Sequence, residues 1–91
     1  MSPYIKQEKR KQLEKTLIKL GSNLNVKGEL TYCIYKLGLE YLKGKEGNYQ
    51  TISDTIAAMN DAGHEFRRQI LDKYEDFKIK ENGDIKWNHI I

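Results

Sequence analysis

The chain has few of the features that mark secreted or membrane-embedded proteins. Its 91 residues include one cysteine, Cys33, which has no partner for an intrachain disulfide. Small secreted domains commonly depend on disulfides, so we expect a reducing, cytoplasmic environment. No apolar run reaches the roughly 18 residues of a membrane-spanning helix, and the first ten residues lack the apolar centre of a signal peptide. We therefore expect neither membrane insertion nor export.

Sequence motifs for catalysis and metal binding are also missing. The chain has no glycine-rich nucleotide loop, no nucleophile motif and no cysteine or histidine pair at metal-binding spacing. His64 and His89 are 25 residues apart, so a zinc site would need further ligands. We expect a protein that is not an enzyme and that uses neither a metal nor an organic cofactor.

The most informative segment that is present spans residues 29–43, ELTYCIYKLGLEYLK, and predicts a helix with almost no polar side. At ~100° per residue its charged side chains fall in one narrow stripe, and most of the remaining circumference is apolar. Such a helix needs burial on several sides, and a short chain has few elements to provide it. We therefore expect a homo-oligomer that assembles through this helix.

Hydrophobic periodicity predicts a single all-α domain over residues 1–91. The predicted helices span about 4–24, 29–43 and 51–75. Ser2 and Pro3 are typical of a helix start, and Thr51 begins a capping-box pattern. Gly63, on the inner stripe of the third helix, predicts a close approach to another element near Gly38.

The end of the chain changes period and predicts a β-hairpin over about 77–88. The segment DFKIKENGDIKW alternates apolar and polar residues around Asn82 and Gly83, a strong hairpin signal. A three-residue loop is the preferred register because it places four apolar side chains on one face. These are Phe77, Ile79, Ile85 and Trp87. A lone hairpin is marginal in water, so we expect it to pack on a helix or on another subunit.

The positive charge of the chain is concentrated at its start. Residues 1–20 carry six basic and two acidic side chains, a net +4, whereas the other 71 residues carry a net −1. A solvated helix face is the main interpretation of this excess. We also expect weak, nonspecific nucleic-acid binding, as a third hypothesis behind the two given below. The pI of 8.9 lies just under the value of roughly 9 that is usual for nucleic-acid-binding domains.

Several polar and aromatic side chains are candidates for binding an anion. Lys6 and Arg10 lie in line with the apolar seam of the first helix, where they need water, an acidic partner or an anionic ligand. Asn60, His64 and Arg67 follow an i, i+4, i+7 spacing, which suits either phosphate binding or a structural ion pair of Arg67.

Arginine and tyrosine provide the remaining candidates. Arg68 has Glu65 and Asp72 within one turn, so a surface ion pair is expected for it. Tyr4 and Tyr49 lie at predicted helix starts, where they could stack on a base or close the end of a bundle. Tyr32 lies on the apolar helix, where packing accounts for it.

Seven short motifs occur in a familiar order along the chain. They are PYIK, Arg10, GELTY, NYQ, EFRR, KYED and ENGD. In this order, over about residues 3–84, the chain resembles a family of small uncharacterised helical proteins found in phages and prophage-rich bacterial genomes. Thr31 stands where the family has asparagine. In the family an aromatic residue follows EF, and Arg67 stands in its place. Arg68 and Gln69 then match the positions of the two family arginines, so the resemblance favours Arg68 over Arg67 as a site residue.

The resemblance implies a phage context in a bacterial host, and compact helical phage proteins often counter host defences. The leading hypothesis is a non-enzymatic protein that sequesters a small anionic nucleotide signal, of the cyclic nucleotide or ADP-ribose type, at a subunit boundary. The alternative is an inhibitor or adaptor that binds a host protein through the apolar helix or the hairpin. The candidate ligand-binding residues are Tyr4, Lys6, Arg10, Tyr32, Tyr49, Asn60, His64, Arg67 and Arg68.

Overall fold

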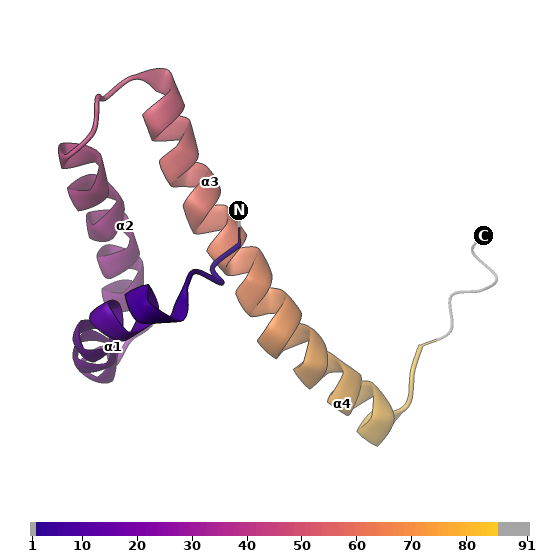
Figure 1. Cartoon of the computed structure of the whole chain (residues 1–91). Helices are drawn as coiled ribbons and strands as arrows, with labels where there is room; N and C mark the ends of the chain where they lie inside the picture. Colours follow the sequence, from indigo (N-terminus) through magenta and orange to yellow (C-terminus); the bar gives the residue numbers. More distant parts are fainter. Residues whose placement is uncertain (1, 86–91) are drawn as a thin grey trace.

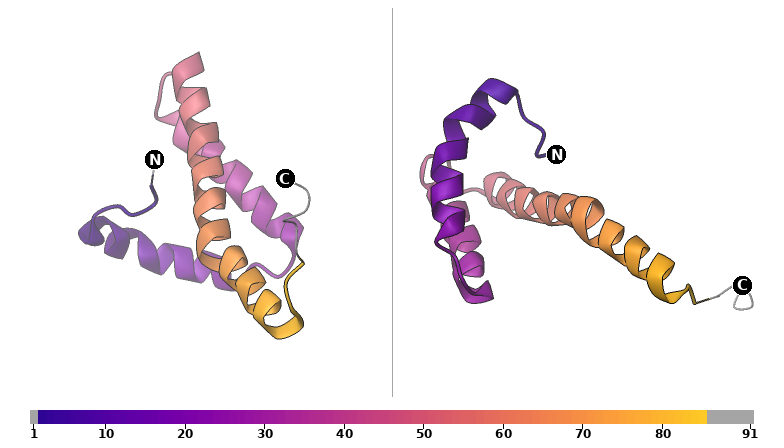
Figure 2. Two further views of the ribbon diagram at one scale, coloured as in Figure 1. Left: turned by 90° about the vertical axis from the view of Figure 1, so that its right-hand side faces the viewer. Right: turned by 90° about the horizontal axis from the view of Figure 1, so that it is seen from below.

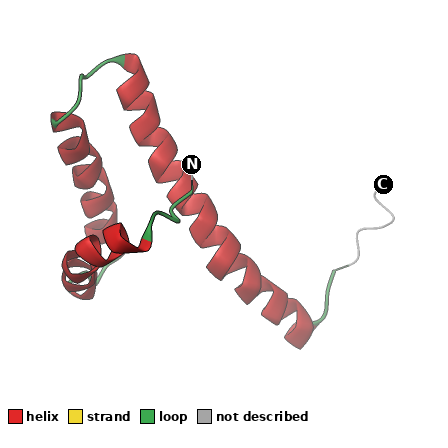
Figure 3. Ribbon diagram, viewed as in Figure 1, coloured by secondary structure: helices red, strands yellow, loops and turns green. Residues whose placement is uncertain are grey.

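The computed structural model describes residues 2–85, and every regular element in that range is helical (Figure 3). The helices are α1 (Gln7–Ser22), α2 (Lys27–Lys43), α3 (Tyr49–Phe66), the π-helical turn η1 (Arg67–Leu71) and α4 (Asp72–Asn82). The last three join without a break into one long helix (Figure 1). The prediction of three helices is therefore confirmed, and the third extends well beyond its predicted end.

The helices form an open arrangement. α2 and α3 run antiparallel as a hairpin, whereas α4 projects away from them (Figures 1 and 2). Within the described residues α1 makes no close backbone contact with another helix. The radius of gyration is 17.7 Å, against about 12 Å for a compact domain of this length. The single chain is therefore much more extended than a closed three-helix bundle.

Local hydrogen bonds explain where the helices begin. The Glu29 carboxylate accepts the backbone N–H groups of Asn25 at 2.6 Å and Val26 at 3.2 Å, and so caps the start of α2. These two bonds lower the pKa of Glu29. At α3 the cap is Asn48, whose side chain accepts the Thr51 N–H at 3.0 Å. The predicted capping role of Thr51 is therefore wrong.

The first helix also begins later than predicted. α1 starts at Gln7 with Lys6 as its N-cap residue, so Ser2 and Pro3 lie outside it. The segment before α1 is irregular, with Ile5 N–H bonded to the Pro3 carbonyl at 3.0 Å. This irregular stretch lets the N-terminus turn back towards the long helix (Figure 1).

The contact between α2 and α3 is centred on a glycine. A Cβ on Gly38 would overlap the Met59 Cε atom and lie 3.3 Å from Thr55 Cγ2. Gly38 and Thr55 are the buried residues of the described range, and Thr55 is 8% exposed. Gly63 has open space around it, so the expected close approach belongs to Gly38, with Met59 and Thr55 as its neighbours.

No large apolar side chain is buried anywhere in the described range. On α2, Leu37 is 54% exposed and Tyr35 is 64% exposed. The apolar helix that the sequence predicts to be buried on several sides is thus largely uncovered within one chain. A folded domain normally closes around an apolar core, so the surface of α2 and α3 lacks a covering element.

The predicted C-terminal hairpin is wrong. Residues 77–82, which contain its first strand and the start of its predicted loop, form the end of α4, and the described range contains no strand. The reason is local: residues 72–82 continue the helix of α3 and η1, Lys78 pairs with Glu81 at 3.8 Å, and Lys80 lies in the last turn, where the helix dipole favours a cation. Gly83, with φ 90°, ends the helix, and its N–H bonds to the Ile79 carbonyl at 2.7 Å. The Asn-Gly pair is therefore a helix terminus, and residues 86–88 of the predicted hairpin lie outside the described residues.

Candidate functional site

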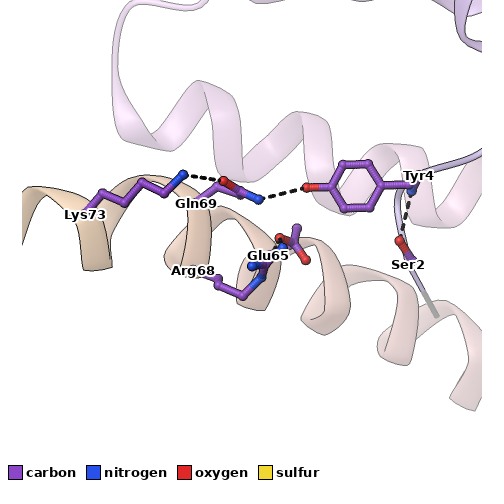
Figure 4. Close-up of polar contacts among 6 residues, drawn as sticks. All are labelled: Ser2, Tyr4, Glu65, Arg68, Gln69 and Lys73. Carbon is purple, nitrogen blue, oxygen red and sulfur yellow. Dashed lines mark hydrogen bonds and ion pairs between the residues drawn. The ribbon is translucent and has the colours of Figure 1, made fainter.

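The N-terminal segment brings Tyr4 onto the long helix. The Tyr4 hydroxyl accepts a hydrogen bond from Gln69 Nε2 at 3.4 Å, although the two residues are 65 positions apart (Figure 4). The Tyr4 backbone N–H donates to Ser2 Oγ at 3.1 Å and so fixes the turn of the segment. We call Ser2, Tyr4, Glu65, Arg68, Gln69 and Lys73 the Tyr4 cluster.

An ion pair lies beside the Tyr4 ring. Arg68 donates to Glu65 Oε1 through Nε at 2.8 Å and through Nη2 at 2.6 Å (Figure 4). Arg68, with a smaller contribution from the Tyr4 hydroxyl, lowers the pKa of Glu65, and Glu65 in turn raises the pKa of Arg68. Lys73 Nζ donates to Gln69 Oε1 at 2.9 Å. The expected ion pair of Arg68 is thus present.

A second arginine approaches Tyr4 from α1. The guanidinium carbon of Arg10 lies 5.9 Å from the centroid of the Tyr4 ring, within the range of a cation–π contact. Arg10 Nε donates to the Ile5 carbonyl at 2.6 Å. Arg10 and Lys11, together with the carboxylate-bearing Glu14, also line a hollow of about 490 Å³ between the N-terminal segment and α1. Its volume falls in the range of small-molecule pockets.

The π-helical turn lies at the Tyr4 cluster. Asp72 N–H donates to the Arg67 carbonyl, five residues earlier, where an α-helix would have a four-residue spacing. Such turns often occur at functional sites. Here the turn includes Arg68 and Gln69, the two residues that meet Glu65 and Tyr4. The irregular backbone and the long-range contact therefore coincide.

The remaining predicted site residues do not join this cluster. Lys6 caps α1, and its carbonyl accepts the N–H groups of Lys9 and Arg10. Tyr49 is 84% exposed at the start of α3. Tyr32 lines a separate shallow hollow next to Glu29 on α2.

The predicted triad on the third helix is likewise separate. Asn60 and His64 are exposed on α3, and Arg67 Nε lies 3.9 Å from Asp72 Oδ1, a loose surface ion pair. Of the nine candidates, the structure brings together Tyr4, Arg10 and Arg68.

Sequence reasoning missed Gln69 and Lys73 as parts of the cluster. Gln69 follows Glu65 by four residues, and Lys73 follows Gln69 by four. This spacing is typical of neighbours on one helix face. That spacing indicates the row of side chains but not its contact with Tyr4. The contact depends on the irregular path of residues 2–6, for which no periodic signal exists.

Two properties of the described range bear on the class of site. No group of three or more histidine, cysteine, aspartate or glutamate residues is placed to hold a metal ion. None of the described helices has both the length and the apolar character needed to cross a bilayer.

The chain belongs to the family described as a domain of unknown function, DUF6899, which matches residues 1–85. This confirms the expectation of an uncharacterised family. No curated protein and no solved structure matches the chain. The phage association implied by the sequence resemblance stays a prediction.

Proposed function

We propose that the chain is a non-enzymatic protein that binds and sequesters a small anionic nucleotide signal, of the cyclic nucleotide or ADP-ribose type. The observation that supports this proposal is the position of Arg10, which lies 5.9 Å from the Tyr4 ring centroid and also lines a hollow of about 490 Å³. An aromatic ring can stack on a base, and a guanidinium can pair with a phosphate. The phage counter-defence context rests on the sequence resemblance.

The hydrogen bonds of the two arginines support different roles for them in the proposed complex. Arg10 uses Nε on the Ile5 carbonyl, so its two terminal NH₂ groups can still donate to a phosphate. Arg68 has Nε and Nη2 on Glu65, and the Glu65 carboxylate repels an anion. In the proposed complex Arg10 and Lys11 therefore contact the phosphate, whereas Arg68 holds the surface on which Tyr4 rests.

Thermal-shift screening with ligand classes tests the proposal. The panel contains cyclic dinucleotides, cyclic oligonucleotides and ADP-ribose isomers. A ligand at a hundredfold excess over its Kd stabilises the folded state by about 2.7 kcal/mol, which raises the Tm of a small domain by roughly 10 °C or more. Recovery of the intact ligand after incubation separates sequestration from catalysis.

A matched pair of arginine variants locates the site. Arg10→Ala is expected to weaken binding about tenfold or more, because charge-assisted hydrogen bonds contribute roughly 1.5–3 kcal/mol. Arg67→Ala, which removes an exposed arginine outside the Tyr4 cluster, leaves the affinity unchanged. Absence of a shift with every ligand, or equal losses in the two variants, contradicts the proposal.

A second candidate function is binding of a host protein through the tyrosines of α2. Tyr32 and Tyr35 are each 64% exposed, and exposed aromatic residues commonly anchor protein interfaces. Affinity capture from host lysate separates the two functions. A stoichiometric protein partner that is lost in a Tyr32→Ala/Tyr35→Ala variant, with no small molecule released on denaturation, favours the second function.

A further inference from the structure

One chain exposes far more surface than a closed domain of its mass. The accessible surface is 8598 Å² for 10.7 kDa, whereas a compact monomer of that mass exposes about 5,500 Å². The excess is about 3,000 Å². Obligate interfaces bury roughly 1,000–2,500 Å² on each partner, so one chain carries at least enough surplus surface for such an interface.

The surface between α2 and the open side of α3 is apolar. A groove of about 640 Å³ runs between these two helices. None of its described lining residues is charged. The charged stripe of α2 lies elsewhere and is internally paired, with Glu40 3.2 Å from Lys36 and 3.0 Å from Lys43. A phosphate or a nucleic acid would find no cation here, so the groove is suited to an apolar partner.

The two walls of the groove differ in side-chain size. The α2 wall carries large side chains, Leu30, Ile34, Leu37 and Tyr41. The α3 wall is lined mainly by small residues, Ala58, Ala62 and Gly63, with Met59 and Phe66. A wall of large side chains fits against a wall of small ones when helices pack closely.

We propose that a second copy of this chain packs on the α2–α3 groove, and that the second copy makes this contact with its own α2–α3 groove. A two-fold axis places the large α2 side chains of each copy over the small α3 residues of the other, so the surface is complementary to itself. The product is a four-helix core built from two hairpins. It supplies the apolar interior that one chain lacks.

Light scattering after size-exclusion chromatography tests the proposal with a matched pair of glutamates. Ala62 lines the groove, whereas Ala57 lies on the opposite side of α3 at ~100° per residue and is exposed. At micromolar concentration the wild-type chain is expected to be a dimer or a multiple of one. Ala62→Glu reduces the mass to 10.7 kDa, and Ala57→Glu retains the wild-type mass.

Cross-linking keeps the test decisive if Ala62→Glu fails to fold. In a Cys33→Ser background, Leu37→Cys chains mixed with Ala62→Cys chains are expected to form mixed dimers with a short bismaleimide at least tenfold faster than Leu37→Cys chains mixed with Ala57→Cys chains, because the proposal places Leu37 of one copy over the α3 wall of the other. A monomeric wild-type chain overturns the proposal. It would mean that α1 of the same chain or an unrelated partner covers the groove. Equal cross-linking rates at the two positions also overturn it.

Discussion

The α2–α3 pair and α4 are both helical and both exposed, but they are stable for different reasons. Seven of the eleven residues of α4 are charged, and within the described range it touches only η1. Local pairs support it, including Lys78 with Glu81 at 3.8 Å and Lys78 over the Tyr74 ring. α2 has five charged residues in seventeen and depends on packing. An exposed helix can therefore be locally complete, like α4, or await a partner, like α2.

The largest effect in this comparison is expected at Gly38, between α2 and α3. Gly38→Val places methyl groups against Met59 and Thr55, where a Cβ alone already overlaps the Met59 side chain. Overpacking of this kind lowers the free energy of unfolding by about 2 kcal/mol. Urea denaturation at fixed protein concentration measures the loss. The control is Gly21→Ala, at a site with nothing within 4 Å, which should stabilise α1 by up to ~1 kcal/mol. A Gly38→Val variant as stable as wild type would refute the close approach of α2 and α3.

A smaller and local effect is expected at the end of α4. Gly83 has φ 90° and ψ 147°, a conformation that costs a non-glycine residue about 1–3 kcal/mol. Gly83→Ala should fray residues 77–82 without moving the global unfolding midpoint, because within residues 2–85 α4 packs on no helix beyond η1. Hydrogen exchange resolved by residue is the appropriate measurement. A midpoint that falls as far as in Gly38→Val would show that α4 belongs to the packed unit.

The smallest expected effect is the pH dependence of the α2 cap. Backbone N–H groups lower the pKa of Glu29 from 4.5, so its stabilising contribution is present above that pH and is lost as the pH falls through the folded-state pKa. Glu29→Gln should therefore show a shallower loss of stability on acidification than wild type. Thermal unfolding between neutral and acidic pH measures it. Glu14→Gln removes the same charge from α1 and should leave the wild-type profile unchanged.

The sequence alone was sufficient for features that depend on near neighbours. The helix over 29–43 and the Arg68–Glu65 pair follow from spacing along one helix. The hairpin failed because an Asn-Gly pair serves both as a turn and as a helix terminus, and the charges of α4 decided for the helix. The Tyr4–Gln69 contact spans 65 residues, so no local pattern contains it.

The apolar circumference of α2 predicts that this helix needs a covering element. Periodicity shows which face of a helix is apolar, but it does not identify the surface that packs against that face. The separation of large α2 and small α3 side chains across the groove becomes visible once the hairpin is assembled. It supports a second copy as the partner.

Sedimentation equilibrium of the 91-residue wild-type chain at micromolar concentration tests this claim most directly. The second-copy account predicts a mass of at least twice 10.7 kDa, with a thermal midpoint that falls on dilution because folding and association are coupled. A single species of 10.7 kDa that unfolds cooperatively at a midpoint independent of concentration would contradict it.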